Sequence, residues 1–304
     1  MALPPRRFMT VFLQQLINGI SLGSVYALFA LGFTLIFGVL EIINLAHSAV
    51  LAVGALLAYT LLTAAHVGLI PALLGASAGT GLLGIAIDYV AFRPLRLRQA
   101  SRLSSLITSI GVALILVNLA QILWGAEPLS YPAGTVPLRF FTGAGLTVSL
   151  LQIVTLATTV VLLIGLRLLL TRTKIGMAIR AVAENPSTAS LLGMPFDRVV
   201  MFTFFLSSAL GGVAGVLVGM LLQGSVSPFM GNTYGLKGLA AIILGGMGDI
   251  TGAVLGGLIM GIGEIMIVQY LNSSYRDGVA FGLLFLVLII RPTGLLGQGR
   301  GREA

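Results

Sequence analysis

Three polar residues interrupt an otherwise apolar stretch in the first part of the chain. Glu41, Asn44 and His47 supply an acid, an amide and an imidazole between two long uncharged runs. A charge at the centre of a bilayer costs about 2.5–3.5 kcal/mol on insertion scales, so such residues usually face a partner or a wet cavity. We therefore predict that these side chains line a polar pathway for a solute. The alternative is an interfacial loop in which Glu41 is solvated and Asn44 caps the next helix.

A second interruption, at 244–252, is rich in glycine and contains Asp249. Glycine destabilises helices, and irregular backbone at membrane depth persists only against protein or a water-filled cavity. Discontinuous helices expose N–H groups that bind anionic groups such as carboxylates. We predict a broken helix beside the pathway at Gly245, Gly246 and Gly248. The alternative is a tight cytoplasmic turn with Asp249 at its tip.

A third acid, Glu264, lies in an apolar stretch with no basic residue within one helical turn. Either it pairs with another helix or it lines a cavity, and a protonated structural carboxyl is the simpler alternative. These interruptions are the main polar or irregular features without an obvious exposed role. We hypothesise that Asn44, His47 and the break at 245–248 approach one another. Glu41 and Glu264 would then form nearby polar walls.

The composition sets the class of protein that must position these residues. The chain has 304 residues, of which 57% are hydrophobic and only 9% charged, and its mean hydropathy is +1.07. Soluble domains carry about 25% charged residues, so lipid must cover most of this surface. Soluble enzymes, nucleic-acid binders and disulfide scaffolds are excluded. We predict an all-α, polytopic integral membrane protein with a single transmembrane domain over 1–304 and about eight or nine transmembrane helices, some broken or re-entrant.

Basic residues give the orientation. They gather at 93–102, at 167–198 and from Arg291 onward, and the positive-inside rule places these segments in the cytoplasm. Two spans then fit between the first and second segments, and four between the second and the tail. Three apolar segments precede the first basic loop, so the N-terminus lies outside unless one of them is re-entrant. Asp88, near the end of the third segment, is expected to reach the interface.

Glycines recur every fourth residue in two of the predicted spans. Such spacing places small residues on one helix face and lets two backbones approach closely. The repeats are Gly211, Gly215 and Gly219, then Gly248, Gly252 and Gly256, and then Gly257 and Gly261. We predict tight helix packing along these faces.

The second basic loop, at about 172–198, contains signals for a short helix. Asn185 can cap a helix that begins with Pro186, and Gly193 can end it in the left-handed conformation. Its last two leucines have little to bury against in their own chain, which favours a docking surface for another protein. A helix lying on the lipid headgroups is the alternative. The residues assigned to this surface are Arg180, Glu184, Asn185, Pro186, Leu191, Leu192 and Gly193.

Several segments together resemble the H-type permease subunit of branched-chain amino acid ABC importers. No segment is specific alone, but the combination is, and it covers nearly the whole chain. The segments are 14–19, 23–28, 43–47, 93–96, 176–193, 244–248 and 291–297. The resemblance implies an all-helical permease of the bacterial cytoplasmic (inner) membrane that imports its solute by alternating access. It also implies that the second basic loop contacts the ATPase.

The resemblance further implies partners: a second, related permease, two cytoplasmic ATPase subunits and an extracytoplasmic solute-binding protein. Lipid surrounds the chain, and no nucleic acid is involved. Lys174 and Lys237 are followed by Ile and Gly, so the chain has no phosphate-binding Gly-x-x-x-x-Gly-Lys-Ser/Thr loop. We therefore expect no cofactor on this chain, with ATP acting through the partner subunits.

Alternatives remain at the level of substrate and class. The family seldom has an acid at the position of Glu41, and an acid beside the path would favour a cationic or amide-bearing ligand, so a permease for urea or short amides is one alternative. A secondary transporter or channel is another. An enzyme is disfavoured because the chain has two histidines, no cysteine and no His-Glu-x-x-His motif. No catalytic or metal site is predicted.

The orientation can be tested by labelling. Single cysteines introduced at Ser101, Ser187 and Gln298 should resist membrane-impermeant thiol reagents in intact cells, because all three positions are predicted to face the cytoplasm. The natural chain has no cysteine and supplies an unreactive background. Labelling of any one position from outside would contradict the orientation given by the charges.

Overall fold

The computed structural model describes residues 5–135, 139–143, 145–222 and 224–297. Within these residues, seven helices are long and apolar enough to cross a membrane. They are α1 (Pro5–Leu40), α2 (Ala46–Thr63), α3 (Leu69–Ile87), α5 (Arg102–Trp124), α6 (Leu150–Arg172), α9 (Phe196–Leu221) and α11 (Ile250–Tyr270). Together with the shorter helices α10 (Met230–Gly245) and α12 (Arg276–Ile290), they confirm the predicted all-α, polytopic membrane fold.

Short elements connect these helices. α3 continues through a π-helical turn, η1 (Asp88–Phe92), into α4 (Arg93–Leu97). α7 (Lys174–Glu184) and α8 (Pro186–Leu191) precede α9, and a 3-10 turn, η2 (Ser273–Tyr275), precedes α12. Two small antiparallel pairs complete the described chain. They are β1 (Leu129–Ser130) with β4 (Ser225–Val226), and β2 (Phe140–Gly143) with β3 (Leu146–Ser149).

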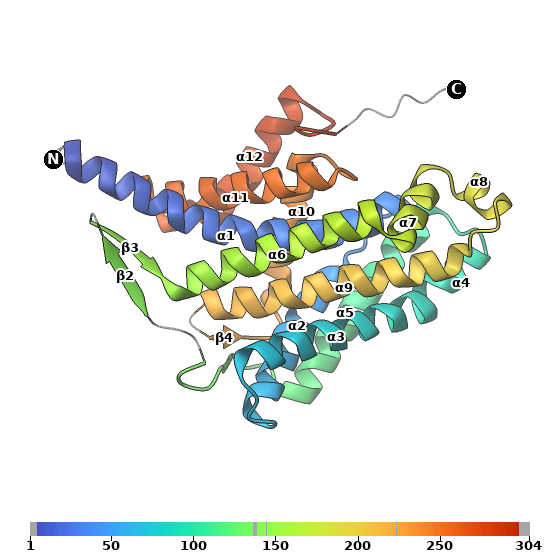
Figure 1. Cartoon of the computed structure of the whole chain (residues 1–304), viewed down its shortest axis with the longest axis horizontal. Helices are drawn as coiled ribbons and strands as arrows, with labels where there is room; N and C mark the ends of the chain where they lie inside the picture. Colours follow the sequence, from blue (N-terminus) through green and yellow to red (C-terminus); the bar gives the residue numbers. More distant parts are fainter. Residues whose placement is uncertain (1–4, 136–138, 144, 223, 298–304) are drawn as a thin grey trace.

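The long helices run between two ends of the bundle (Figure 1). At one end, Gln14 of α1 exchanges two hydrogen bonds of 2.8 Å with the backbone of Thr147 in β3. At the other end, which holds α4, α7 and α8, Glu41 forms an ion pair with Arg102 just beyond α1. The N-terminal end of α1 therefore lies on the face opposite the first two basic loops. The three predicted crossings before Arg93 require this arrangement.

The basic end also holds the two described labelling positions, Ser101 and Ser187, whereas Gln298 lies outside the described residues. Asp88 is buried there, at 2% exposure, in an ion pair with Arg96. The prediction that Asp88 reaches the interface is therefore wrong. Arg96 of α4 pairs with the Asp88 carboxylate, so this carboxylate does not need to reach water.

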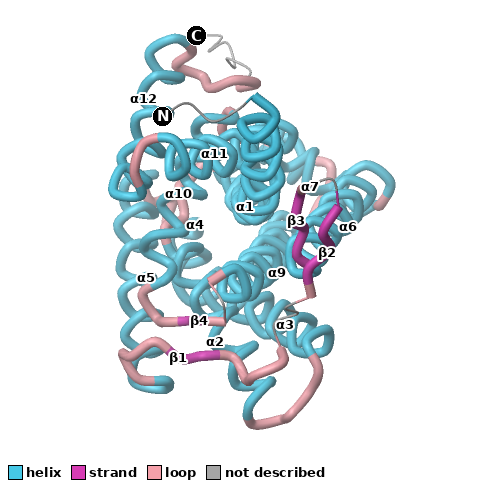
Figure 2. Tube along the Cα trace, turned by 90° about the vertical axis from the view of Figure 1, so that its left-hand side faces the viewer, coloured by secondary structure: helices cyan, strands magenta, loops and turns pink. Residues whose placement is uncertain are grey.

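The glycine repeats lie where helices touch. α9 lies between α1 and the α2–α3 pair, as the view along the bundle shows (Figure 2). A side chain at Gly215 would collide with the Leu51 carbonyl of α2, and one at Gly257 would collide with Ala27 of α1. The prediction of close packing is confirmed for the glycines within α9 and α11, whereas Gly248 lies in the turn before α11 and makes no close helix contact among the described residues.

The pair β1–β4 lies against the end of α2 that is remote from the basic loops. Tyr131, directly after β1, is buried and donates a hydrogen bond of 3.1 Å from its hydroxyl to the Ala55 carbonyl. Burial raises the pKa of Tyr131, so its hydroxyl remains protonated and keeps donating. This contact ties the connection after α5 to α2.

Replacing Gly54 with Ala should destabilise the bundle, because the added carbon would meet the backbone of Gly212 where α2 crosses α9. Overpacking of this kind costs about 1–3 kcal/mol, which lowers the midpoint of thermal unfolding in detergent. Gly111 in α5 is the matched control, because an added carbon there meets nothing within 4 Å. Gly111→Ala should be neutral or stabilising by up to about 1 kcal/mol. Equal midpoints for the two variants would contradict the packing analysis.

Candidate functional site

The break after α1 places irregular backbone inside the bundle. Residues 41–45 are not helical, and α2 then begins beside the middle of α1. The His47 ring stacks on Phe29 with 4.6 Å between ring centroids and meets Phe33 edge-on at 4.9 Å. Phe33 lies seven residues before Leu40, so α2 starts about 10 Å inside the end of α1, at 1.5 Å per residue. The structure therefore has the predicted break inside the bundle, and Asn44 also bonds the start of α2 as the alternative expected.

Side chains satisfy the exposed backbone of this break. The hydroxyl of Ser109, fully buried in α5, accepts a hydrogen bond of 3.2 Å from Leu45 N and donates one of 2.7 Å to Leu106 O. The Asn44 side chain accepts a bond of 3.2 Å from Ala46 N. Irregular backbone at membrane depth needs such partners. Sequence reasoning missed Ser109, because it is one of four hydroxyl residues near the start of α5 and nothing local distinguishes it.

His47 is a packing residue in this structure. Its side chain has no exposed surface and lies among Phe29, Phe33 and the backbone of Gly211, with Nδ1 3.4 Å from the Ser207 hydroxyl. Asn44 is also buried, at 3% exposure. Neither residue lines one of the described cavities. Both hold the break in place, so the prediction that they line a pathway does not match the geometry.

A cleft of about 440 Å³ lies beside the break, between α1, α2, α5 and α10. Most of its wall is apolar, and several lining residues are exposed, including Leu114 at 60% and Leu236 at 50%. Amide and hydroxyl groups are rare on lipid-facing surfaces and usually face protein or a wet cavity. Four such side chains line this cleft: Ser48, Asn118, Gln121 and Asn232. The cleft can accept an aliphatic group while offering hydrogen bonds to a polar one.

Sequence reasoning did not single out the cleft-lining amides. Asn118 and Gln121 are uncharged and isolated within a long apolar helix, and their amide groups donate to backbone carbonyls one turn earlier. Nothing in the sequence connects them to Asn232, more than a hundred residues later. The fold brings them to one surface because α5 and α10 both lie beside the start of α2.

The second interruption is a turn at the basic end of the bundle. α10 ends at Gly245, and the Asp249 carboxylate caps α11 by accepting a bond of 2.6 Å from Gly252 N. The C-terminal segment closes over this turn: Leu295 N donates to Leu244 O and Leu296 N to Gly245 O, each at 2.9 Å. The alternative of a tight turn with Asp249 at its tip is therefore the one seen.

Gly246 and Gly248 have positive φ angles, of 110° and 90°, which explains why glycine occupies both positions of this turn. Gly235 of α10 lies against Ser48, near the start of α2, and it is ten residues before Gly245. The turn is therefore about 15 Å along the helix from the start of α2. The hypothesis that Asn44 and His47 approach this turn is wrong. Uniform apolar sequence gives no measure of depth, and only the packing of α10 on α2 supplies it.

Glu41 lies beside the turn rather than beside the cleft. A second cavity, of about 550 Å³, is lined by Glu41, Arg102, Gly248 and Asp249, and by Ala183 of α7. The Glu41 carboxylate is paired with Arg102, so it does not present an isolated negative charge. The proposed effect of this acid on substrate preference therefore loses its basis.

Glu264 is paired across helices. Its carboxylate, buried at 1% exposure, receives hydrogen bonds of 2.8 Å from the Tyr26 hydroxyl and 2.9 Å from Lys237 Nζ. The guanidinium of Arg276 completes the set of donors. One acid thus joins α1, α10, α11 and the start of α12. It lines none of the described cavities, so its predicted role as a polar wall of the pathway is replaced by a structural one.

The predicted short helix of the second basic loop is present as α8. Asn185 caps it by accepting a bond of 2.9 Å from Thr188 N, Pro186 is its first residue, and Gly193 follows it with φ of 78°. Leu191 and Leu192 are exposed at 88% and 72%. These two side chains form an apolar surface at the basic end of the bundle.

The preceding helix, α7, buries one face through Gly176, Ile179 and Val182. Arg180 and Glu184 lie on its exposed side, and the described residues give no ion pair between them. Their charges are therefore directed to the surroundings of α7 and not to each other.

Glu264→Gln should destabilise the protein strongly. It leaves Lys237 buried without its counter-charge, and removing one member of a buried ion pair typically costs about 3–5 kcal/mol. Thermal unfolding in detergent measures the loss. Glu127→Gln is the control: Glu127 is exposed in the loop after α5, and surface changes usually stay within about 0.5 kcal/mol. A midpoint for Glu264→Gln equal to that of the control would refute the structural role.

Comparison with known proteins agrees with this architecture. The sequence profile of the family described as branched-chain amino acid transport system / permease component matches residues 15–288. The high-affinity branched-chain amino acid transport system permease protein BraD of Pseudomonas aeruginosa is 37% identical over 299 residues, which cover 94% of this chain and 96% of that protein. The corresponding permease protein LivH of Escherichia coli K12 is 36% identical over 302 residues, with the same coverage. A probable LivH of Methanocaldococcus jannaschii is 33% identical over 90% of this chain and 89% of that protein. The chain therefore belongs to the family of permease components of branched-chain amino acid transport systems.

Proposed function

We propose that this chain is the permease subunit of an ABC importer that moves branched-chain amino acids across the cytoplasmic membrane by alternating access. The observation that carries the proposal is the similarity over nearly the whole chain to BraD and LivH, whose names state this transport. The chain is a multi-pass membrane protein and a transport subunit, not an enzyme. ATP hydrolysis is supplied by separate subunits.

The cleft beside the break is the part of the chain best suited to the solute. Its apolar wall, which includes Phe33 and Leu45, suits an aliphatic side chain. Asn118 and Asn232 offer amide groups of the kind that can hydrogen-bond an ammonium or a carboxylate. The cleft lies on the surface of the bundle, so a second permease placed over it would enclose the path.

The paired state of Glu41 favours an aliphatic amino acid over urea or a short amide. That alternative depended on an isolated acid beside the path, and Glu41 is instead bound to Arg102 near the basic end. The cleft itself contains no charged side chain among its lining residues. An apolar cavity with a few amides suits leucine, isoleucine and valine.

The two ends of the bundle support the following proposal for the remaining partners. Two cytoplasmic ATPase subunits would act on the assembly at the basic end, and α8 with its exposed leucines is the contact that this chain offers. An extracytoplasmic solute-binding protein would deliver the amino acid at the opposite end, which carries the β2–β3 hairpin (Figure 1). ATP thus acts through partner subunits, and the chain itself needs no cofactor.

The proposal is tested by reconstituting the complete complex in liposomes with its binding protein. ATP-dependent uptake of radiolabelled leucine should be competed by isoleucine and valine but not by urea or acetamide. Uptake without ATP and without the ATPase subunits would indicate a secondary transporter or channel instead. Uptake competed by urea alone would indicate the amide-carrying alternative.

Replacing both exposed leucines, Leu191→Asp with Leu192→Asp, should leave the permease inserted and folded but abolish the stimulation of ATP hydrolysis by substrate. Charged side chains cannot enter an apolar groove on the ATPase without a large desolvation cost. The assay is substrate-stimulated ATPase activity of the reconstituted complex. Leu271→Asp is the matched control, because Leu271 is exposed at 68% at the opposite end of the bundle. Normal stimulation in the double variant would show that the coupling surface lies elsewhere.

A further inference from the structure

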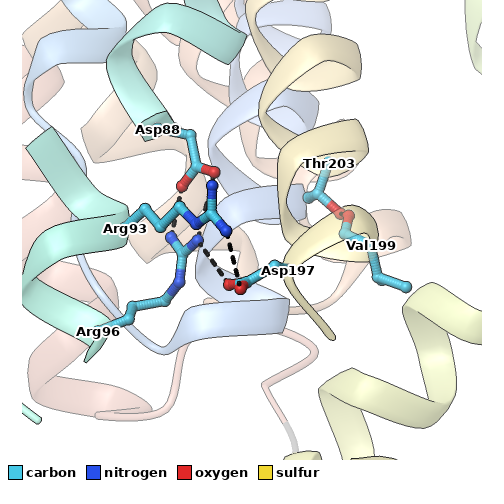
Figure 3. Close-up of polar contacts among 6 residues, drawn as sticks. All are labelled: Asp88, Arg93, Arg96, Asp197, Val199 and Thr203. Carbon is cyan, nitrogen blue, oxygen red and sulfur yellow. Dashed lines mark hydrogen bonds and ion pairs between the residues drawn. The ribbon is translucent and has the colours of Figure 1, made fainter. Parts of the chain in front are cut away.

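Four charged side chains form a cluster at the basic end of the bundle (Figure 3). Arg96 of α4 donates to both carboxylate oxygens of Asp88, and its Nη2 also lies 3.4 Å from Asp197 Oδ1. Arg93 Nη2 lies 3.7 Å from Asp197 Oδ2. The cluster therefore joins the end of the third span to the first turn of α9, which follows much later in the chain.

The two arms of the cluster differ in burial. The Asp88 side chain is exposed at 2% and that of Arg96 at 16%, whereas those of Arg93 and Asp197 are exposed at 40% and 42%. Breaking a buried ion pair is strongly unfavourable, while exposed pairs contribute little to stability. Asp88 therefore fixes Arg96 in place, and Asp197 is held by contacts that can open and re-form at low cost.

Arg93 also contacts an aromatic ring of the segment that precedes it, the ring of Tyr89. Its guanidinium carbon lies 5.3 Å from the centre of the Tyr89 ring, one turn earlier. A cation over an aromatic face keeps an orientation that an isolated arginine would not keep. η1 therefore positions both arginines, through Asp88 and Tyr89. Asp197 belongs to a different segment, the first turn of α9.

Asp197 lies on one of the two connections that join α8 to the rest of the bundle. α8 ends at Leu191, Gly193 follows it and α9 begins at Phe196, so only a few residues separate the exposed leucines from the Asp197 carboxylate. α9 then packs against α1, α2 and α3 and contacts His47 at the start of α2. A displacement of α8 therefore acts on α7 before it and on the N-terminal turn of α9 after it.

We propose that the cluster is a latch between the coupling segment, which is α8 with its connection to the start of α9, and the end of the third span. Arg96, fixed by Asp88, holds Asp197 together with Arg93 in the arrangement seen here, and movement of α8 by the ATPase opens the Asp197 contacts. The inference rests on the proposed function, because it requires an ATPase that acts on α8. Asp197 is a positioning residue: it acts through α9 and touches no solute.

The test uses the complete reconstituted complex and compares leucine imported per ATP hydrolysed. Asp197→Asn keeps the size of the side chain and removes its charge. It should lower that ratio about fivefold or more, the lower end of ordinary coupling between sites, and raise ATP hydrolysis in the absence of leucine. Asp197→Glu restores the carboxylate and should recover most of the ratio. The yield of folded permease should stay unchanged, because the Asp197 side chain is 42% exposed.

Arg98→Gln is the control for loss of a charge in the same basic loop. Arg98 is exposed, and the described residues give it no ion pair, so the ratio should remain at the wild-type value. An unchanged ratio in Asp197→Asn, with a wild-type complex that imports leucine, would overturn the latch alone. A wild-type complex that neither imports leucine nor hydrolyses ATP in response to it would overturn the proposed function and the latch together.

Discussion

The structure depends on the need of every charge inside the bundle for a partner. The Glu264 carboxylate meets this need with Tyr26, Lys237 and Arg276, which come from three other helices. An unpaired ion in a medium of low dielectric constant is unfavourable, so the four helices cannot separate without exposing the carboxylate or its partners to lipid. This requirement fixes α1, α10, α11 and α12 relative to one another. The surfaces that they leave uncovered, including the cleft, follow from that arrangement.

Close backbone contacts fix the other half of the bundle. Gly54 and Gly212 meet where α2 crosses α9, and Gly215 lies against the Leu51 carbonyl. Lipid gives helices no hydrophobic driving force to associate. Close van der Waals packing must therefore supply much of the free energy of association. The short start of α2 can then lie deep in the bundle. Ser109 and Asn44 satisfy its backbone, and the cleft opens directly beside it.

Two kinds of ion pair occur at the basic end, and they differ in burial. Buried pairs, such as Asp88 with Arg96, join neighbouring elements, whereas half-exposed contacts, such as Asp197 with Arg93, occur where the segment that we propose for coupling joins the bundle. An alternating-access permease needs both, because its frame must persist while some contacts change between states. The basic end therefore has both kinds of ion pair, as we expect of a surface on which ATPase subunits would act. The cleft lies farther along the same helices.

The sequence by itself determined the membrane class and the small helix α8, because composition and capping residues act locally. It also determined that the glycine repeats lie at helix contacts. It did not determine which polar residues face the cleft: Asn44 and His47 are buried in packing, Glu264 is paired, and the turn at Gly246 lies at the basic end. Depth and pairing arise from contacts between helices far apart in the chain. A uniformly apolar sequence contains no local signal for them, so only the tertiary structure decided which polar groups are partners of one another and which line the cavities.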